Sequence, residues 1–78
     1  MKLTIEYLES LVVAEQYHVF PGTTMTVCCL TLKNGFSVIG ESACINPDDF
    51  DQDIGRKIAR ANAINKLWQL EGYRIKSA

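Results

Sequence analysis

The sequence has few of the residues that bind metals. It contains one histidine and three cysteines, and it has no Cys-x-x-Cys pair, so the ligand spacing of a structural zinc site is missing. Cys28 and Cys29 are adjacent in a strand-like run, where neighbouring side chains point to opposite faces and do not share an ion. An odd number of cysteines cannot close a complete disulfide framework. We therefore expect no metal, and thiols that act as small buried hydrophobic residues.

Long hydrophobic runs and an excess of basic charge are also missing. The most apolar stretch, Met25–Leu32, is far shorter than the roughly 20 residues that span a bilayer. The amino terminus reaches Glu6 without the apolar run of a secretory signal. Eight basic and nine acidic residues give a net charge of −1, whereas domains that coat nucleic acid are usually strongly basic. We expect a cytoplasmic protein that binds neither a membrane nor a nucleic acid polymer.

Catalytic and nucleotide-binding motifs are lacking as well. His18 has no nucleophile elbow near it, and an ordinary strand-end histidine explains it better than a catalytic one. The glycines match neither the dinucleotide fingerprint nor the P-loop. The aspartates at 48–53 lack the loop spacing of a calcium site and fit as carboxylates at the start of a helix. The sequence therefore predicts a protein without enzymatic activity, catalytic residues or cofactor.

The patterns that are present indicate a single domain over residues 1–78. Apolar residues at helical spacing after Thr4, a suitable N-cap, predict a helix over residues 4–15. Residues 17–20 predict a short strand, which Pro21-Gly22 ends in a turn.

A β-hairpin is the clearest local signal. Two runs rich in β-forming residues, 25–33 and 36–45, flank Asn34-Gly35, which is typical of a two-residue type I′ turn. Such a turn pairs Leu30 with Ile39 and leaves apolar side chains on both faces. One layer of helix covers only one face, so we expect a partner surface and a homo-oligomer.

A long helix is predicted after the hairpin. Asn46 is a suitable N-cap, with Pro47 at the first helical position, and Gly72 stands where a C-terminal cap belongs. Gly55 and Ala59, one turn apart, indicate that the helix backbone lies close to a neighbour. The residues expected to face the sheet are Phe50, Ile54, Ile58, Ala61, Asn65 and Trp68.

Residues 73–75 suggest a last short strand after this helix. The predicted fold class is α+β: a short N-terminal helix, a small antiparallel β-sheet centred on a β-hairpin, and a long C-terminal helix packed on the sheet.

Three basic residues, Arg56, Lys57 and Arg60, gather on one sector of the long helix. One interpretation is a solvated face, in which Asp53 and Lys57 form a weak i, i+4 pair. The other is an anion-binding site, because arginine forks hold phosphate oxygens bidentately. Phe36, at the hairpin tip, fits either an ordinary core aromatic or a platform for a base. The residues alone leave these alternatives open.

Several segments together carry a family resemblance over roughly residues 17–75. They are Thr26–Phe36 with its Asn-Gly-Phe, Gly40–Cys44, Asn46–Asp51 with its Pro-x-x-Phe-Asp, Gly55–Ala59, and Lys66–Tyr73 with its Trp-x-Leu-Glu-Gly-Tyr. This pattern resembles the small tailed-phage proteins of the gene 49/gene 66 family. One branch of that family, Thoeris anti-defence protein 1, is a phage sponge that binds the glycocyclic ADP-ribose made by bacterial TIR proteins. Some relatives hold cyclic oligonucleotides, in homo-oligomers with pockets between subunits.

The resemblance implies that this chain sequesters a cyclic nucleotide immune signal without cleaving it, as a cytoplasmic homo-oligomer. Phe36 would stack on a base, and Asn46 would hydrogen-bond its polar edges. Arg56, Lys57 and Arg60 would meet the phosphates. The alternative function is a phage adaptor or inhibitor that binds a host protein through an apolar sheet face.

Overall fold

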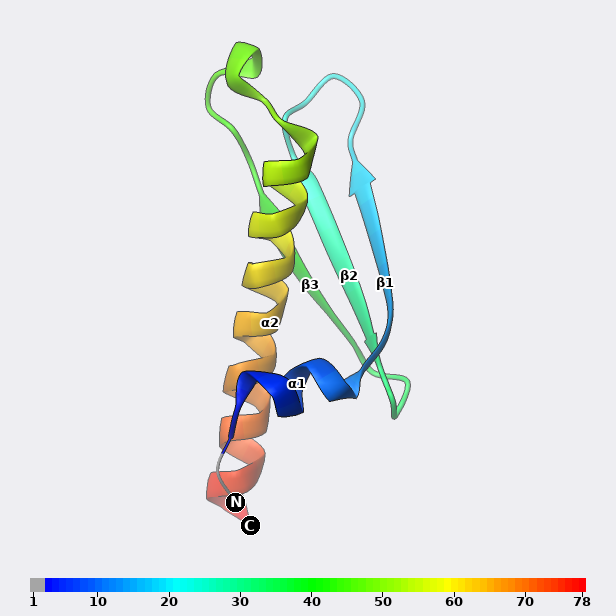
Figure 1. Ribbon diagram of the computed structural model, residues 1–78, viewed down its shortest axis with the longest axis vertical. Helices are drawn as coiled ribbons and strands as arrows, with labels where there is room; N and C mark the ends of the chain where they lie inside the picture. Colours follow the sequence, from blue (N-terminus) through cyan, green and yellow to red (C-terminus); the bar gives the residue numbers. More distant parts are fainter. Residues whose placement is uncertain (1–2) are drawn as a thin grey trace.

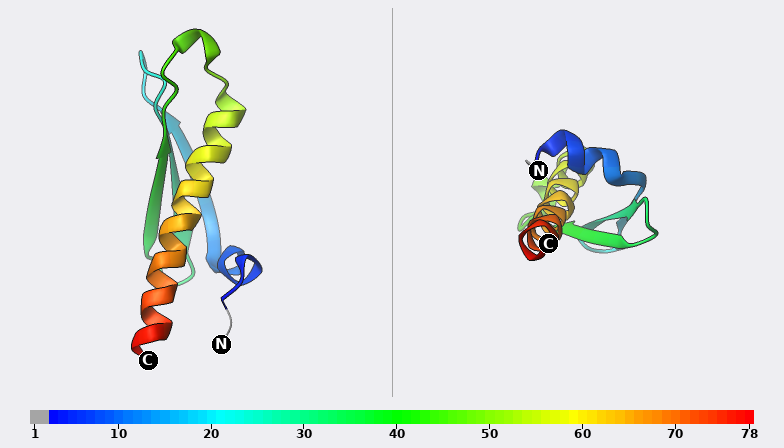
Figure 2. Two further views of the ribbon diagram at one scale, coloured as in Figure 1. Left: turned by 90° about the vertical axis from the view of Figure 1, so that its left-hand side faces the viewer. Right: turned by 90° about the horizontal axis from the view of Figure 1, so that it is seen from below.

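The computed structural model describes residues 3–78. In chain order its elements are α1 (Ile5–Leu11), β1 (Val12–Val19), β2 (Thr26–Leu32), β3 (Ser37–Ser42), the 3-10 turn η1 (Pro47–Asp49) and α2 (Gln52–Ser77). The strands form an antiparallel sheet in the order β1-β2-β3, and α2 covers one of its faces (Figure 1). Figure 2 shows α1 on the same side of the sheet as α2. This arrangement confirms the predicted α+β fold.

The N-terminal helix is shorter than predicted. The Thr4 hydroxyl accepts a hydrogen bond from the Tyr7 N–H at 3.1 Å, as expected of an N-cap. The helix ends at Leu11 instead of residue 15, because Val12 already has extended backbone and pairs with β2. Pairing along a sheet edge outweighs helical periodicity here, and β-branched residues favour it. The strand predicted over 17–20 is the second half of β1.

The turn between β2 and β3 is not the predicted type I′ turn. That turn needs positive φ at both central residues, whereas Gly35 alone takes it, at 88°. The Leu32 N–H donates to the Phe36 carbonyl at 2.8 Å, and the Gly35 N–H donates to the Leu32 carbonyl at 2.9 Å. The hairpin therefore closes through a three-residue loop.

This longer loop shifts the strand register by one residue and exchanges the faces of β3. Leu30 pairs with Val38, so Val38 is buried in the core. Ile39, which the predicted turn paired with Leu30, lies on the outer face and is 46% exposed. Val27 and Cys29 share that outer face and are only partly buried. The outer face therefore carries apolar side chains, as predicted, beside the exposed Ser37 and Glu41 of β3.

Helix α2 packs on the sheet through small residues. Gly40 of β3 lies so close to α2 that a Cβ atom there would collide with backbone atoms of Ala59 and Ala63, both fully buried. A Cβ atom on Gly55 would lie 2.9 Å from the Thr26 Oγ1. These distances confirm that Gly55 and Ala59 mark a close approach of the helix backbone.

The larger apolar residues that the sequence placed against the sheet mostly face away from it. Ile54 and Ile58 are 55% and 49% exposed, and Trp68 is half-buried at the edge of the core. The small-residue face of α2 is buried instead because it allows the closest contact with the sheet. The buried core consists of Leu8, Cys28, Leu30, Leu32, Val38, Ala59, Ala63, Ile64 and Leu67.

The start of α2 lies later than predicted. Asn46 caps η1, and its side chain accepts a hydrogen bond from the Asp48 N–H at 3.1 Å. The cap of α2 is Asp51, whose carboxylate accepts from the Asp53 N–H at 2.9 Å and from the Ile54 N–H at 3.5 Å. Asn46 is thus an N-cap, as predicted, but it caps the separate turn η1 and not α2.

The end of α2 also lies later than predicted. The helix continues past Gly72 to Ser77, so residues 73–75 are helical and form no strand. In its last turns Arg74 donates to the Glu71 carboxylate at 2.7 Å. Basic residues near a helix C-terminus complement its dipole, which favours this extension. Among the described residues, no helix has both the length and the apolar character needed to span a membrane.

Candidate functional site

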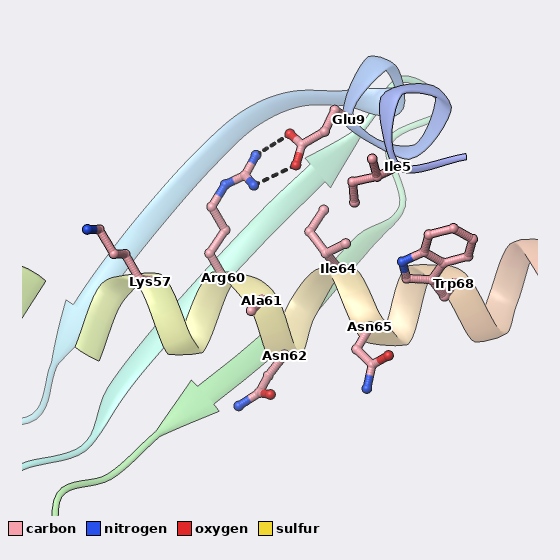
Figure 3. Close-up of a pocket in the computed structure, with 9 residues that line it drawn as sticks. All are labelled: Ile5, Glu9, Lys57, Arg60, Ala61, Asn62, Ile64, Asn65 and Trp68. Carbon is pink, nitrogen blue, oxygen red and sulfur yellow. Dashed lines mark hydrogen bonds and ion pairs between the residues drawn. The ribbon is translucent and has the colours of Figure 1, made fainter. Parts of the chain in front are cut away.

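A groove of about 580 Å³ runs between α1 and the middle of α2 (Figure 3). Its volume lies within the range of about 300–1,000 Å³ typical of small-molecule sites. It is lined by Ile5 and Glu9 of α1 and by Lys57, Arg60, Ala61, Asn62, Ile64, Asn65 and Trp68 of α2. In Figure 3, Lys57 lies at one end and Trp68 at the other, with the Arg60–Glu9 pair between them.

Arg60 links α2 to both N-terminal elements. Its two terminal nitrogens donate to the two carboxylate oxygens of Glu9 at 2.7 and 2.6 Å, and its Nε donates to Glu15 at 3.1 Å. Such bidentate, charge-assisted bonds are among the strongest that side chains form. They raise the pKa of the Arg60 guanidinium above its ordinary value and lower the pKa of Glu9. Arg60 is therefore neutralised within the fold.

Tyr17 extends this network along β1. Its hydroxyl donates to Glu15 at 3.0 Å, and burial together with this bond raises the pKa of Tyr17 to about 12. The Arg56 guanidinium lies 5.9 Å from the centre of the Tyr17 ring, within cation–π range. Arg56 also lies 3.8 Å from Asp53, with about half of its side chain exposed. Arg56 is thus held more loosely than Arg60.

The five residues predicted to bind a ligand do not meet within one protomer. Lys57 and Arg60 line the groove, whereas Arg56 does not. Phe36, 57% exposed, follows the β2–β3 turn, and Asn46 caps η1 at the opposite end of the molecule (Figure 1). The exposure of Phe36 excludes the alternative of a core aromatic within the protomer. Ligand binding by these five residues stays a prediction.

The sequence patterns did not predict the partners of Arg60. Glu9 and Glu15 lie 51 and 45 residues away from it in the chain, and no local motif relates them. Glu15 was expected on the N-terminal helix, so its position on β1 was missed as well. Trp68 was expected in the core; it packs against the core edge and also lines the groove.

Fold and site together define a class of small α+β protein in which one long helix covers a three-stranded antiparallel sheet and borders a groove. Within residues 3–78 no group of three or more His, Cys, Asp or Glu side chains is placed to hold a metal ion. The model of the Phage protein (N4 Gp49/phage Sf6 gene 66) family matches residues 3–78. The chain belongs to this family, as its motifs indicated. No curated protein and no solved structure matches it.

Proposed function

We propose that this phage-family protein is a sponge that binds and sequesters a cyclic nucleotide immune signal in the host cytoplasm, as a homo-oligomer. The signal is of the glycocyclic ADP-ribose type or a cyclic oligonucleotide. The groove beside α2 carries the proposal. At one end the indole of Trp68 offers a face on which a base stacks. At the other end Lys57, which forms no ion pair within the described residues, offers a charge to a phosphate.

The charge balance of the groove limits what one protomer contributes. Glu9 offsets Arg60, so Lys57 supplies the net positive charge. Phe36 and Asn46 lie outside the groove, and in this proposal they reach the ligand from a neighbouring subunit. A homo-oligomer is therefore part of the proposed function.

Binding without cleavage is part of the proposal, and the groove residues support it. Glu9 is the carboxylate in the groove, and its lowered pKa makes it a weak proton acceptor at neutral pH. Among the described residues, those that line the groove include no serine, threonine, cysteine or histidine, the side chains that commonly serve as a nucleophile or as a base.

The test is calorimetric titration of cyclic ADP-ribose-type ligands and cyclic oligonucleotides into the wild type, Lys57→Gln and Lys66→Gln. Lys66 is exposed on the same helix but outside the groove, which makes it a matched control. We expect wild-type binding, a loss of more than tenfold in Lys57→Gln, and no change in Lys66→Gln. Heating the complex should release the ligand intact. Failure of the wild type to bind any of these ligands, or release of a cleaved product, would refute the sponge.

A second candidate is the adaptor that binds a host protein through the sheet. Its support is the outer sheet face, which no element of residues 3–78 covers and on which Ile39 is 46% exposed. In that case Ile39→Glu should lose a host protein that the wild type captures, whereas Ser37→Glu on the same face should retain it. That result, with no nucleotide binding by the wild type, favours the adaptor.

A further inference from the structure

Helix α2 carries an apolar repeat that the sheet does not use. Starting at Ile54, the repeat recurs at alternating steps of four and three residues. Its members, here called the α2 seam, are Ile54, Ile58, Ala61, Asn65, Trp68, Gly72 and Ile75. A spacing that averages 3.5 residues is the heptad pattern of a helix that wraps around another helix. The face of α2 that packs on the sheet is a different one, which carries Ala59, Ala63 and Leu67.

The N-terminal half of the α2 seam lies in solvent. Ile54 and Ile58 are about half exposed, and Ala61 and Asn65 are also exposed. Trp68, further along, is half-buried. Apolar side chains that line up along an exposed helix face indicate a surface that is covered in the working protein.

We propose that the α2 seam packs against the α2 seam of a second copy of this chain, with the two helices antiparallel. An alignment centred on residue 63 places large residues of one copy opposite small residues or the indole of the other. Its layers pair Ile54 with Gly72, Ile58 with Trp68, and Ala61 with Asn65 of the partner subunit. Each layer occurs twice by symmetry, as a two-fold interface requires.

The charges beside the seam favour this orientation. In the alignment Lys57 flanks the seam opposite Glu71 of the partner subunit, but that carboxylate is already held by Arg74 of its own helix at 2.7 Å and contributes little to the choice of orientation. Asp53, near the start of α2, comes close to the basic end of the partner helix, which carries Arg74 and Lys76 in its last turn. A parallel pair would instead place each Asp53 beside its copy and align the two helix dipoles unfavourably.

The length and composition of the seam suit a defined dimer. Its 22 residues make about three heptads and a contact about 33 Å long. Asn65 is the polar residue in this seam, and a single buried Asn in a heptad seam restricts register and number of chains at some cost in stability. The sheets then lie on the outside, and the two helices form the middle of a four-layer arrangement.

This proposal rests on the proposed function in one respect: it specifies how two subunits of the proposed homo-oligomer pack together. Trp68 of the partner subunit stacks near Ile58, beside Lys57 at the mouth of the groove. Ala61, Asn65 and Trp68 belong both to the α2 seam and to the lining of the groove, so the second copy covers the groove along α2 and a bound ligand lies between the two subunits. The contact between seams does not itself require a ligand.

The first test measures mass by light scattering at micromolar concentration, without ligand. The wild type should have twice the monomer mass of 8.7 kDa, and Ile58→Glu should be a monomer. Leu70→Glu is the matched control, because Leu70 is 46% exposed on α2 but lies off the seam; it should stay a dimer. Circular dichroism verifies that all three proteins are folded. A monomeric wild type, or dissociation by Leu70→Glu as complete as by Ile58→Glu, overturns the proposal.

The second test fixes the orientation by disulfide cross-linking, in a background where Cys29→Ser and Cys44→Ser remove the two less buried thiols. Ala61→Cys and Asn65→Cys are oxidised separately and as an equimolar mixture. Antiparallel seams bring residue 61 within disulfide range of residue 65 of the other copy but keep identical positions too far apart. We expect a covalent dimer only in the mixture. Cross-linking of either variant with itself, or none in the mixture, overturns the antiparallel alignment.

The nucleotide sponge and the interface between α2 seams can be refuted independently of each other. A dimer that binds no nucleotide contradicts the sponge and retains the interface, whereas a monomer that binds nucleotide contradicts the interface and retains the ligand.

Discussion

Replacing Arg60 with glutamine should loosen the contact of α2 with α1 and β1. The substitution removes three charged hydrogen bonds and leaves Glu9 and Glu15 without their shared cation. The two carboxylates that remain near each other repel, which adds to the loss of folding stability. If Arg60 were instead a solvated residue available to a ligand, the same substitution would leave stability unchanged.

The size of the effect follows from the burial of the pair. Fully exposed ion pairs contribute about 0–1 kcal/mol, whereas removing one partner of a buried pair costs about 3–5 kcal/mol. The side chains of Arg60 and Glu9 are 28% and 40% exposed, so water screens part of the interaction. Because the hydrogen bonds are bidentate, we expect the pair to contribute more to stability than a fully exposed ion pair does. We therefore expect Arg60→Gln to cost about 1–2 kcal/mol and to lower Tm by roughly 4–15 °C in a domain of this size.

A double-mutant cycle with Glu9→Gln, measured by urea denaturation, isolates the pair. The coupling energy should be about 1 kcal/mol. Arg56→Gln serves as the control, because its ion pair is longer and more exposed, and it should change stability by less than about 0.5 kcal/mol. A coupling energy near zero, or equal losses in Arg60→Gln and Arg56→Gln, would refute the structural role of Arg60.

Three further predictions concern two other contacts and the pH dependence of the Arg60–Glu9 pair. Gly40→Ala should destabilise by about 2 kcal/mol or more in urea denaturation, since its Cβ meets the backbone of Ala59; an unchanged midpoint would contradict this close contact. Trp68→Ala should cost about 2–3 kcal/mol, less than the roughly 3–5 of a fully buried aromatic, and a loss of a few tenths would show that Trp68 packs on nothing. The pKa of Glu9 lies below its ordinary 4.5, so the Arg60 pair stabilises at neutral pH and loses this contribution as pH falls through the folded-state pKa. Acid titration of Glu9→Gln should show a smaller loss of stability below about pH 4.5 than the wild type shows.

The types of element were predictable from the sequence, but their register was not. The Asn34-Gly35 signal correctly indicated a hairpin. A two-residue and a three-residue loop differ in whether Asn34 also takes positive φ, and Asn tolerates either conformation. That choice decides whether Val38 or Ile39 reaches the core. The local sequence does not indicate which of the two registers forms, because packing of the sheet against α2 selects it.

The face of α2 that packs on the sheet was misassigned for a related reason. Hydrophobicity alone favours Ile54 and Ile58, whereas contact area favours the side that approaches most closely. Gly40 makes that approach possible, but only once β3 lies beside α2. The candidate site was predictable in part: Lys57 and Arg60 do line the groove, but the carboxylates that occupy Arg60 come from residues distant in the chain.

The backbone contact between β3 and α2 has a mechanical consequence. Where Gly40 lies against Ala59 and Ala63, there are no long side chains whose rotamers can rearrange, so α2 cannot slide or tilt without opening a gap. The sheet and α2 therefore behave as one stiff body. The opposite wall of the groove, α1, is a helix of seven residues held to that body by the buried Leu8, by Tyr7 and Leu11, which pack against the core, and by the Arg60–Glu9 bridge. A widening or closing of the groove thus requires α1 to move relative to the body formed by the sheet and α2.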